Sequence, residues 1–266
     1  MTDSAVTTGA SGTARPAIGL IFRSLLRADF TVLVRSGRTL VLNIVLPIVI
    51  LVITDLHSGA GGAGAVLTSA LFSIGLALTY GLMSSSLIGY SLSIARDREA
   101  GVFQRLRVTP APTWAIMTSR LLVQIVLDII MTVLVLIIGG VLHHLAFNAG
   151  EVLLILAVSI AGGAMFLAIA QAIVGLVRSA AVVNALGRVL YIVFLLLGLL
   201  GSSGILGATV TAISSWTPVG AMINLYGGVL DLSKWDWTDT TGFIAMAGYI
   251  VIGAFVGIRW FRWDAR

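Results

Sequence analysis

This chain of 266 residues contains no cysteine and few charged residues. Without cysteine it can form neither a disulfide nor a thiolate metal site. Charged residues make up 10% of the sequence, whereas an ordinary soluble chain carries roughly 25%. Hydrophobic residues make up 58%. The composition therefore excludes a soluble domain and a disordered chain, and it predicts an all-α membrane protein.

Motifs for nucleotide binding and for catalysis are missing as well. No Gly-x-x-x-x-Gly-Lys-Ser/Thr loop occurs in the sequence, so the chain cannot cradle ATP phosphates in that way. No Ser–His–Asp set or paired carboxylates are evident. The serines at 84–86 have no base near them in sequence, and the pair His143 and His144 is a weak metal signal. We therefore expect no enzyme activity and no metal in this chain.

Charge-free gaps predict six membrane-spanning helices, because about 20 apolar residues cross a hydrocarbon core of about 30 Å. Between Arg188 and Asp231 no charge occurs, and this stretch is too long for one helix. We predict one span followed by a re-entrant outer hairpin at about 207–230, with two full spans as the alternative. The six spans are expected at about 38–55, which contains Pro47, and at about 66–95, 114–142, 152–177, 185–206 and 240–258.

The distribution of charge predicts the orientation. With six spans, both termini share one side of the membrane, and every basic residue except Lys234 falls on that side or at its boundary. The positive-inside rule makes this the cytoplasmic side. The net charge of +5 is then an orientation signal and not a sign of nucleic-acid binding.

The N-terminal segment has neither the charged start nor the apolar run of a cleaved signal peptide. Residues 1–14 are expected to form a disordered cytosolic tail, and 15–266 a single transmembrane domain. Within 17–35, Ile18, Ile21, Phe22 and Leu25 recur at helical spacing, which predicts an amphipathic helix on the inner leaflet. The alternative is that this segment extends the first span.

The cytosolic loop at 96–112 differs from the other, shorter loops. It carries two acids and four arginines. Val102, Phe103 and Leu106 would share one side of a short helix, which Thr-Pro-Ala-Pro would end. Such a helix, held between two spans, suits contact with a partner protein. The alternative is that the charges only anchor the spans.

The run from Asp97 to Pro110 (Asp-Arg-Glu-Ala-Gly-Val-Phe-Gln-Arg-Leu-Arg-Val-Thr-Pro) resembles the loop of ABC transporter type-2 permeases. The similarity is greatest to the drug-resistance exporter branch of the daunorubicin-resistance permease. In that family an acidic, glycine-containing stretch and Leu-x-x-Thr-Pro follow the second of six helices. Ser-Trp-Thr-Pro-Val at 215–219 is similar to a second family element, in the outer hairpin. Many members have Gly-Thr followed by Glu, where this chain has Gly101-Val102 and Gln104-Arg105.

The resemblance implies the permease subunit of an ATP-driven exporter in the bacterial plasma membrane. Its cargo would be lipophilic or amphiphilic, and its partners would be two copies of a separate ATP-binding subunit and a second copy of the permease. ATP and Mg²⁺ would bind to the ATPase, and this chain would hold no cofactor. The residues expected to contact the ATPase are Arg96, Asp97, Arg98, Glu99, Gly101, Phe103, Arg105, Leu106, Thr109 and Pro110.

Two alternative functions remain at this stage. One is a permease that exports a polysaccharide or glycolipid, since that related branch shares the six-span plan. The other is a secondary transporter that works without ATP. Such a transporter typically carries several carboxylates within its spans, whereas Asp128 is the single acid found there.

Polar residues within the spans are candidates for the substrate path. Asp128, Gln124 and Gln171 are the residues selected. The alternative for Asp128 is a structural ion pair with Arg188 or Arg120, and the alternative for the glutamines is hydrogen bonding between helices. The small pairs Gly139–Gly140 and Gly162–Gly163 are expected where helices pack closely.

Overall fold

A computed structural model describes residues 18–35, 37–56, 70–107, 112–202 and 207–260, and every regular element in these ranges is helical. The expected tail at 1–14 lies outside them. The elements are α1 (Ile18–Arg35), α2 (Gly37–Leu56), α4 (Ala70–Leu82), η1 (Met83–Tyr90), α5 (Ser91–Glu99), α6 (Val102–Arg107), α7 (Thr113–Leu142), α8 (Ala149–Leu176), α9 (Ala180–Ser202), α10 (Ala208–Ser214), α11 (Pro218–Leu230), η2 (Leu232–Lys234) and α12 (Trp237–Trp260).

Five continuous helices in the described ranges are long and apolar enough to cross a membrane. They correspond to the second to sixth predicted spans and cover Ala70–Glu99, Trp114–Leu142, Ala149–Leu176, Ala180–Gly201 and Trp237–Trp260. The first predicted span falls on α2, whose apolar stretch Asn43–Leu56 is shorter than these five helices. The chain is therefore a multi-pass membrane protein with an all-helical fold.

The second span changes its helical winding midway. α4, η1 and α5 follow one another without a break, and η1 is a π-helix of eight residues. In a π-helix each N–H bonds to the carbonyl five residues earlier, and such segments are frequent at functional sites. α5 continues to Glu99, so the loop predicted at 96–112 begins while the chain is still helical.

Small residues allow the helices to approach closely, as the sequence predicted for the glycine pairs. A Cβ on Gly162 would lie 2.2 Å from the methyl carbon of Met222, and one on Gly139 would lie 2.8 Å from Ile74. Between α12 and α8, a Cβ on Gly253 would lie 2.8 Å from the carbonyl carbon of Ala168. The backbone contact at Gly253 leaves no room for a larger side chain and so sets the spacing of α8 and α12, whereas at Gly162 the end of the Met222 side chain would have to shift.

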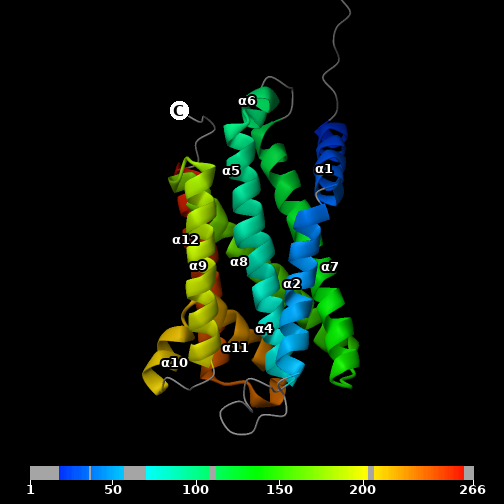
Figure 1. Cartoon of the computed structure of the whole chain (residues 1–266), viewed down its shortest axis with the longest axis vertical. Coiled ribbons are helices and arrows are strands. Elements are labelled where there is room, and N and C mark those ends of the chain that lie inside the picture. Colours follow the sequence, from blue (N-terminus) through cyan, green and yellow to red (C-terminus); the bar gives the residue numbers. More distant parts are fainter. Residues whose placement is uncertain (1–17, 36, 57–69, 108–111, 203–206, 261–266) are drawn as a thin grey trace, which may run out of the picture.

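The segment between α9 and α12 forms a helical hairpin. Thr217 caps α11 by accepting a hydrogen bond from the Gly220 N–H at 3.1 Å, and Pro218 occupies the first turn, where no N–H is required. α11 packs against α4, α8, α9 and α12, and most of its residues are buried. The short α10 packs beside α9 near the same end of the bundle (Figure 1).

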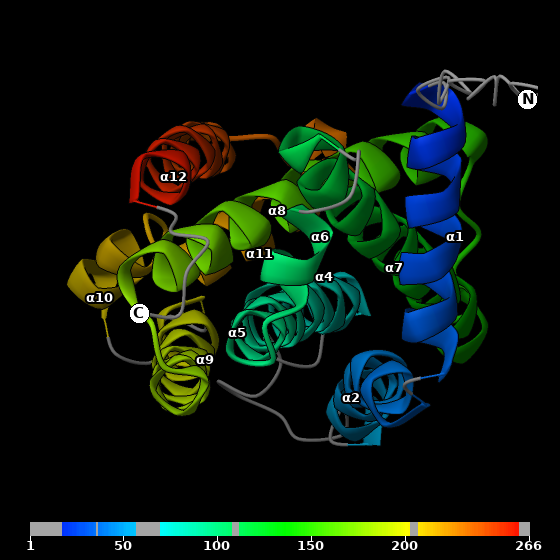
Figure 2. The same ribbon diagram turned by 90° about the horizontal axis from the view of Figure 1, so that it is seen from above.

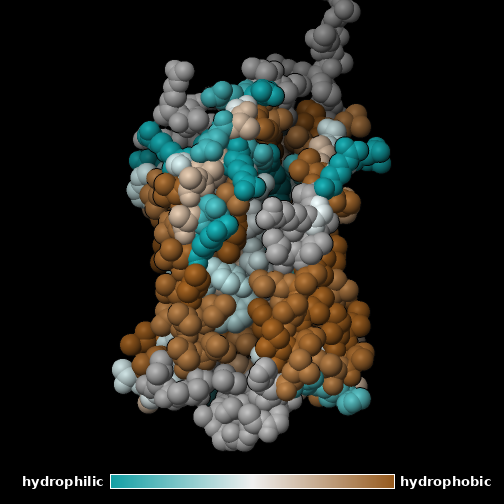
Figure 3. Space-filling view, in the orientation of Figure 1, coloured by the Kyte–Doolittle hydropathy of each residue, from teal (hydrophilic) through white to brown (hydrophobic). Residues whose placement is uncertain are grey.

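Two ends of the bundle can be distinguished. α1, α6 and the last turns of α12 lie at one end, whereas α10 and the connection from α7 to α8 lie at the other (Figure 1). Seen along the bundle, α2, α5 and α9 appear end-on, whereas α1 is seen lengthwise at the edge beside α7 (Figure 2). The surface over the sides of the bundle is mainly hydrophobic, and hydrophilic residues gather at the α6 end (Figure 3). We call this end the α6 end.

Candidate functional site

The candidate partner-binding element is the turn from α5 into α6. Gly101 makes this turn with φ +69°, a conformation that residues with a Cβ rarely adopt. Phe103 in α6 is completely buried, and Leu106 packs against the core, so the apolar side predicted for this helix faces the bundle. The Arg120 guanidinium carbon lies 5.0 Å from the centre of the Phe103 ring. α6 is thus docked on the bundle by an aromatic anchor and a cation–π contact.

The exposed side of the same turn forms a shallow hollow. It is lined by Glu99, Ala100, Gly101, Gln104 and Arg105. Three of these, Glu99, Gln104 and Arg105, present charged or amide groups to the surface. The exposed groups of Gln104 and Arg105 are available for polar contacts with a partner protein.

Arg98 occupies a different position from the one expected. It is 2% exposed, and its guanidinium donates hydrogen bonds to the carbonyls of Val174 at 2.9 Å, Val177 at 2.6 Å and Arg178 at 2.8 Å. The last carbonyls of a helix have no partner within the helix, so Arg98 satisfies the C-terminal end of α8. Within this chain Arg98 is a buried structural residue and does not lie on the surface as expected. Phe103 is also buried, because its ring packs in the hydrophobic core. Contact of either residue with an ATPase remains a prediction.

Glu99 makes a hydrogen bond to the first residue of α9. Its Oε1 accepts a hydrogen bond from the Ala180 N–H at 2.6 Å. Ala180 is the first residue of α9, where N–H groups lack a helical partner and a carboxylate is favoured by the helix dipole. Glu99 is also exposed, so it belongs both to the surface hollow and to this contact.

A charge cluster joins α1, α5 and α7 at the α6 end. Arg120 donates to a carboxylate oxygen of Asp97, and its Nε lies 3.9 Å from Asp29 Oδ1. The Ser119 hydroxyl donates to the other oxygen of Asp29. Burial raises the pKa of Asp29 above its ordinary value, and this effect exceeds the lowering by Ser119 and Arg120. The cluster fixes the crossing helix α1 to the bundle.

The remaining predicted contact residues divide by position. Arg96 and Arg105 are exposed, and Leu106 is half-buried. Thr109 and Pro110 lie outside the described residues. The sequence identified the segment, but it did not distinguish the side chains that face outward from those that attach the segment to the bundle.

Asp128 is the centre of a second polar cluster, inside the bundle. It is 1% exposed, and its two oxygens accept hydrogen bonds from Ser85 and Ser86, both at 2.7 Å. The Gln124 amide donates to Ser85 and lies 3.4 Å from Asp128 Oδ1. Asp128 and Gln124 come from α7, whereas both serines come from η1. The cluster therefore joins the π-helix to α7.

The alternative ion pair predicted for Asp128 is wrong. Arg120 instead contacts Asp29 and Asp97, and Arg188 is exposed on α9. Sequence reasoning also missed Ser85 and Ser86. Their signal was a run of hydroxyl groups inside an apolar span, where a buried donor needs an acceptor. Gln171 lies apart from this cluster, and its side-chain oxygen accepts from the Tyr90 hydroxyl at 3.0 Å.

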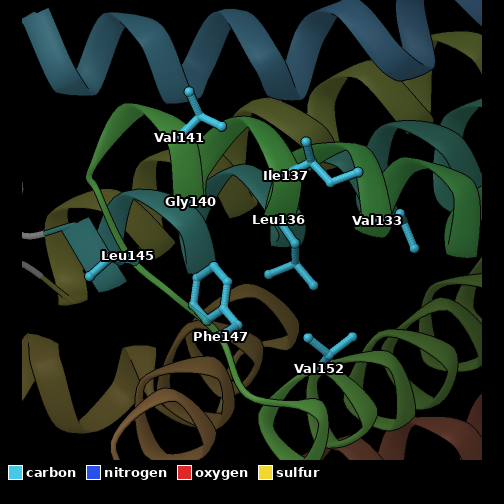
Figure 4. A pocket seen from close by; sticks show the side chains of 8 residues that line it. All are labelled: Val133, Leu136, Ile137, Gly140, Val141, Leu145, Phe147 and Val152. Atoms are coloured by element: carbon cyan, nitrogen blue, oxygen red, sulfur yellow. The ribbon is translucent and has the colours of Figure 1, made fainter.

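An apolar hollow of about 370 Å³ lies between α7 and α8 toward the opposite end from α6. Figure 4 shows Val133, Leu136, Ile137 and Val152 around it, with Phe147 from the connecting loop at one side. Gly140 is part of its lining. Its lining residues carry no polar side chain, so it offers packing surface only to an apolar group.

No group of three metal-ligating side chains occurs in the described ranges. His143, one of the two histidines considered above, lies with Nδ1 3.4 Å from Asp55 Oδ1. This contact joins the C-cap residue of α7 to the last turn of α2. Within the described ranges His143 therefore has a carboxylate neighbour and no metal-binding constellation.

The fold defines a helical multi-pass membrane protein with a short docked helix, α6, after the helix from Ala70 to Glu99. The family model of the ABC-2 type transporter matches residues 21–229. The chain belongs to this family, whose permeases normally work with an ABC ATPase subunit. Among curated proteins, none matches the sequence significantly.

Proposed function

We propose that the chain is the permease subunit of an ATP-driven exporter and that a separate ATPase docks on the exposed side of the α5–α6 turn. The observation that carries this proposal is the contrast between the two sides of α6. Phe103 is buried against the bundle, whereas Gln104 and Arg105 point outward beside Glu99. Because this chain contains no phosphate-binding loop, ATP and Mg²⁺ would bind in the partner.

The proposed topology has six spans, with α2 as the first. α2 packs against α4 and α7, and its axis runs in a different direction from that of α1 (Figure 2). Six spans place α1 and the end of α12 on the same side of a bacterial plasma membrane, and the basic residues make this side cytoplasmic. α1 then lies at the inner interface.

In this topology the α10–α11 hairpin is a re-entrant outer element. α10 has 7 residues and α11 has 13, and at 1.5 Å per residue neither spans a hydrocarbon core of about 30 Å. The burial of α11 among four helices supports this placement, because chain that turns back at membrane depth must be covered by protein.

Two copies of the chain are proposed to form the permease, with one ATPase below each. Only 17% of the apolar window of α9 is buried, against 78% for the helix from Ala70 to Glu99. The exposed side of α9 is therefore the surface proposed to pack against the second copy. Closure of the two ATPases would move the α5–α6 turns and change access to a path between the copies.

The proposed cargo is lipophilic or amphiphilic, as in the drug-resistance branch. Within the described spans, both oxygens of Asp128 accept hydrogen bonds from neighbouring hydroxyl and amide groups. The rest of the interior is mainly apolar. Such an interior supports an apolar cargo more than an ion or a sugar chain. Export of a polysaccharide or glycolipid is the competing assignment within the same family.

The test is co-expression with an ABC ATPase whose gene neighbours the gene of this chain, followed by purification through a tag on the permease. The expected result is a stable complex whose ATPase rate rises with daunorubicin, together with ATP-dependent daunorubicin transport in inverted vesicles. No complex with the wild-type turn would overturn the proposal. A complex without daunorubicin transport would overturn the drug-resistance branch alone.

A further inference from the structure

We propose that Arg98 and Glu99 are positioning residues that fasten the connection between α8 and α9 to the α5–α6 turn, so that both move as one body. This inference rests on the proposed function for its consequence in transport. The attachment itself is argued from the contacts of this chain alone.

The first half of the attachment is the end of α8. Arg98 donates to three carbonyls in this region, those of Val174, Val177 and Arg178. Five N–H donors in a rigid planar group make arginine well suited to hold several acceptors in a fixed geometry. Because Arg98 is 2% exposed, water does not compete effectively for these bonds.

The second half is the start of α9. Glu99, the next residue in the sequence, accepts from the Ala180 N–H at 2.6 Å. α8 ends at Leu176 and α9 begins at Ala180, so the intervening connection is only 177–179. Two consecutive side chains of α5 thus hold both ends of one very short connection. Both helices also pack directly on α5.

The surface that would receive the ATPase adjoins these contacts. Glu99 lines the hollow together with Gln104 and Arg105, and it also binds Ala180. A displacement applied at the hollow is therefore transmitted to the start of α9 by the Glu99 hydrogen bond, together with the direct packing of α9 on α5.

Glutamate 99 offers a matched pair of variants. Glu99→Ala removes the acceptor for the Ala180 N–H, whereas Glu99→Gln keeps a side-chain oxygen at the same distance and removes the charge. Because Glu99 is exposed, both variants are expected to fold. Arg98→Met is the stronger but more disruptive change, since it leaves three carbonyls at the α8 end without their partner.

The absence of cysteine permits site-specific spin labels on two introduced cysteines. One pair, Gln104 with Val182, reports the distance from α6 to α9. A second pair, Val45 with Val182, reports the distance from α2 to α9. All three positions are exposed. Distance distributions are measured by double electron–electron resonance for the permease alone and for the ATPase complex with and without ATP.

In the wild type the 104–182 distance is expected to be narrow and unchanged by ATP, while the 45–182 distance shifts. In Glu99→Ala the 104–182 distribution broadens and the ATP-dependent population shift of 45–182 falls about tenfold, as loss of a charge-assisted hydrogen bond implies. Glu99→Gln restores both. A merely structural role would leave the ATP-dependent shift intact in every folded variant.

The two proposals fail in different ways. If no ATPase binds, no pair responds to ATP, yet the 104–182 distribution of the permease alone still tests the attachment. The attachment is overturned if 104–182 changes with ATP in the wild type, or if Glu99→Ala and Arg98→Met leave both distributions as they were. If Arg98→Met does not fold, the comparison of Glu99→Ala with Glu99→Gln decides.

Discussion

At the scale of single residues, Asp128 shows how an acid can be accommodated within an apolar bundle. Its two oxygens are taken up by Ser85 and Ser86, and Gln124 adds a third donor. Gly163 makes room for it, since a Cβ there would lie 2.8 Å from Asp128 Oδ2. The carboxylate therefore acts first as a link between η1 and α7, and a role in the substrate path remains a proposal.

Replacing Asp128 tests this link. Asp128→Leu removes the acceptor of the Ser85 and Ser86 hydroxyls and is expected to lower the free energy of unfolding by about 3 kcal/mol or more. Asp128→Asn keeps one acceptor oxygen and is expected to lose only about 1 kcal/mol. Thermal unfolding in detergent measures both, with Gln171→Ala as a polar control outside the cluster. Equal losses for the two Asp128 variants would contradict the account.

Asp29 predicts a pH effect at the α6 end. Its pKa is raised from the ordinary 3.8, mainly by burial. The stability that the protonated Asp29 contributes to the folded state is fully present below pH 3.8. It is lost as the pH rises through the raised pKa. The unfolding temperature of wild type relative to Asp29→Asn should therefore fall as the pH rises above 3.8 toward neutrality.

Asp236 is the matched control for Asp29. The Thr238 side chain holds the pKa of Asp236 below its ordinary value, so this carboxyl stays ionised throughout the same pH interval. The difference between wild type and Asp236→Asn should be nearly constant over this interval. A slope for Asp236 equal to that for Asp29 would assign the effect to the detergent or to other groups.

At the scale of elements, α6 is a helix of only six residues that depends on its anchor. Such a short helix is not stable by itself in water. Phe103, Leu106 and the cation–π contact of Arg120 supply the tertiary contacts that hold it. The surface proposed to receive the ATPase therefore depends on these buried contacts.

Phe103→Ala should remove this surface without removing the protein from the membrane. Truncating a buried phenylalanine typically loses about 3–5 kcal/mol, which exceeds what a single turn of helix can supply. Recovery of the ATPase with the tagged permease is expected to fall at least tenfold. Gln104→Ala, an exposed neighbour, controls for loss of a side chain from α6. Equal recovery with Phe103→Ala and wild type would refute the anchor.

At the scale of the whole molecule, composition and the spacing of charges were sufficient to predict the all-helical membrane fold. Five long helices coincide with predicted spans. The sequence of residues 97–110 resembles ABC type-2 permeases, and the match to the ABC-2 type transporter model confirms this family. Contacts between helices were not predictable from one sequence. The partners of Asp128 and the burial of Arg98 depend on how α5, η1, α7 and α8 are rotated against one another, and no local pattern encodes this rotation.

Single cysteines test the proposed topology, because each is unique in this chain. A cysteine at Ser233, which is exposed in η2, should react with a membrane-impermeant maleimide added to intact cells. A cysteine at Gln104 should react only after the membrane is opened. In the proposed topology α7, α8 and α9 cross the membrane between these two positions, so the cysteines lie on opposite sides. Labelling of both cysteines from the same side would contradict this topology.

The π-helix η1 has a consequence for how the chain tolerates changes in length. Its hydrogen bonds span one residue more than those of α4 and α5, so each of its turns holds surplus chain. Deleting Ile88 can be absorbed if η1 rewinds as an α-helix, whereas a deletion within α8 rotates everything that follows it. The Ile88 deletion is expected to reach wild-type levels in the membrane, and deletion of Ala164 is expected to fall below them, as measured by quantitative immunoblotting. Natural insertions and deletions in this span would then collect at 83–90.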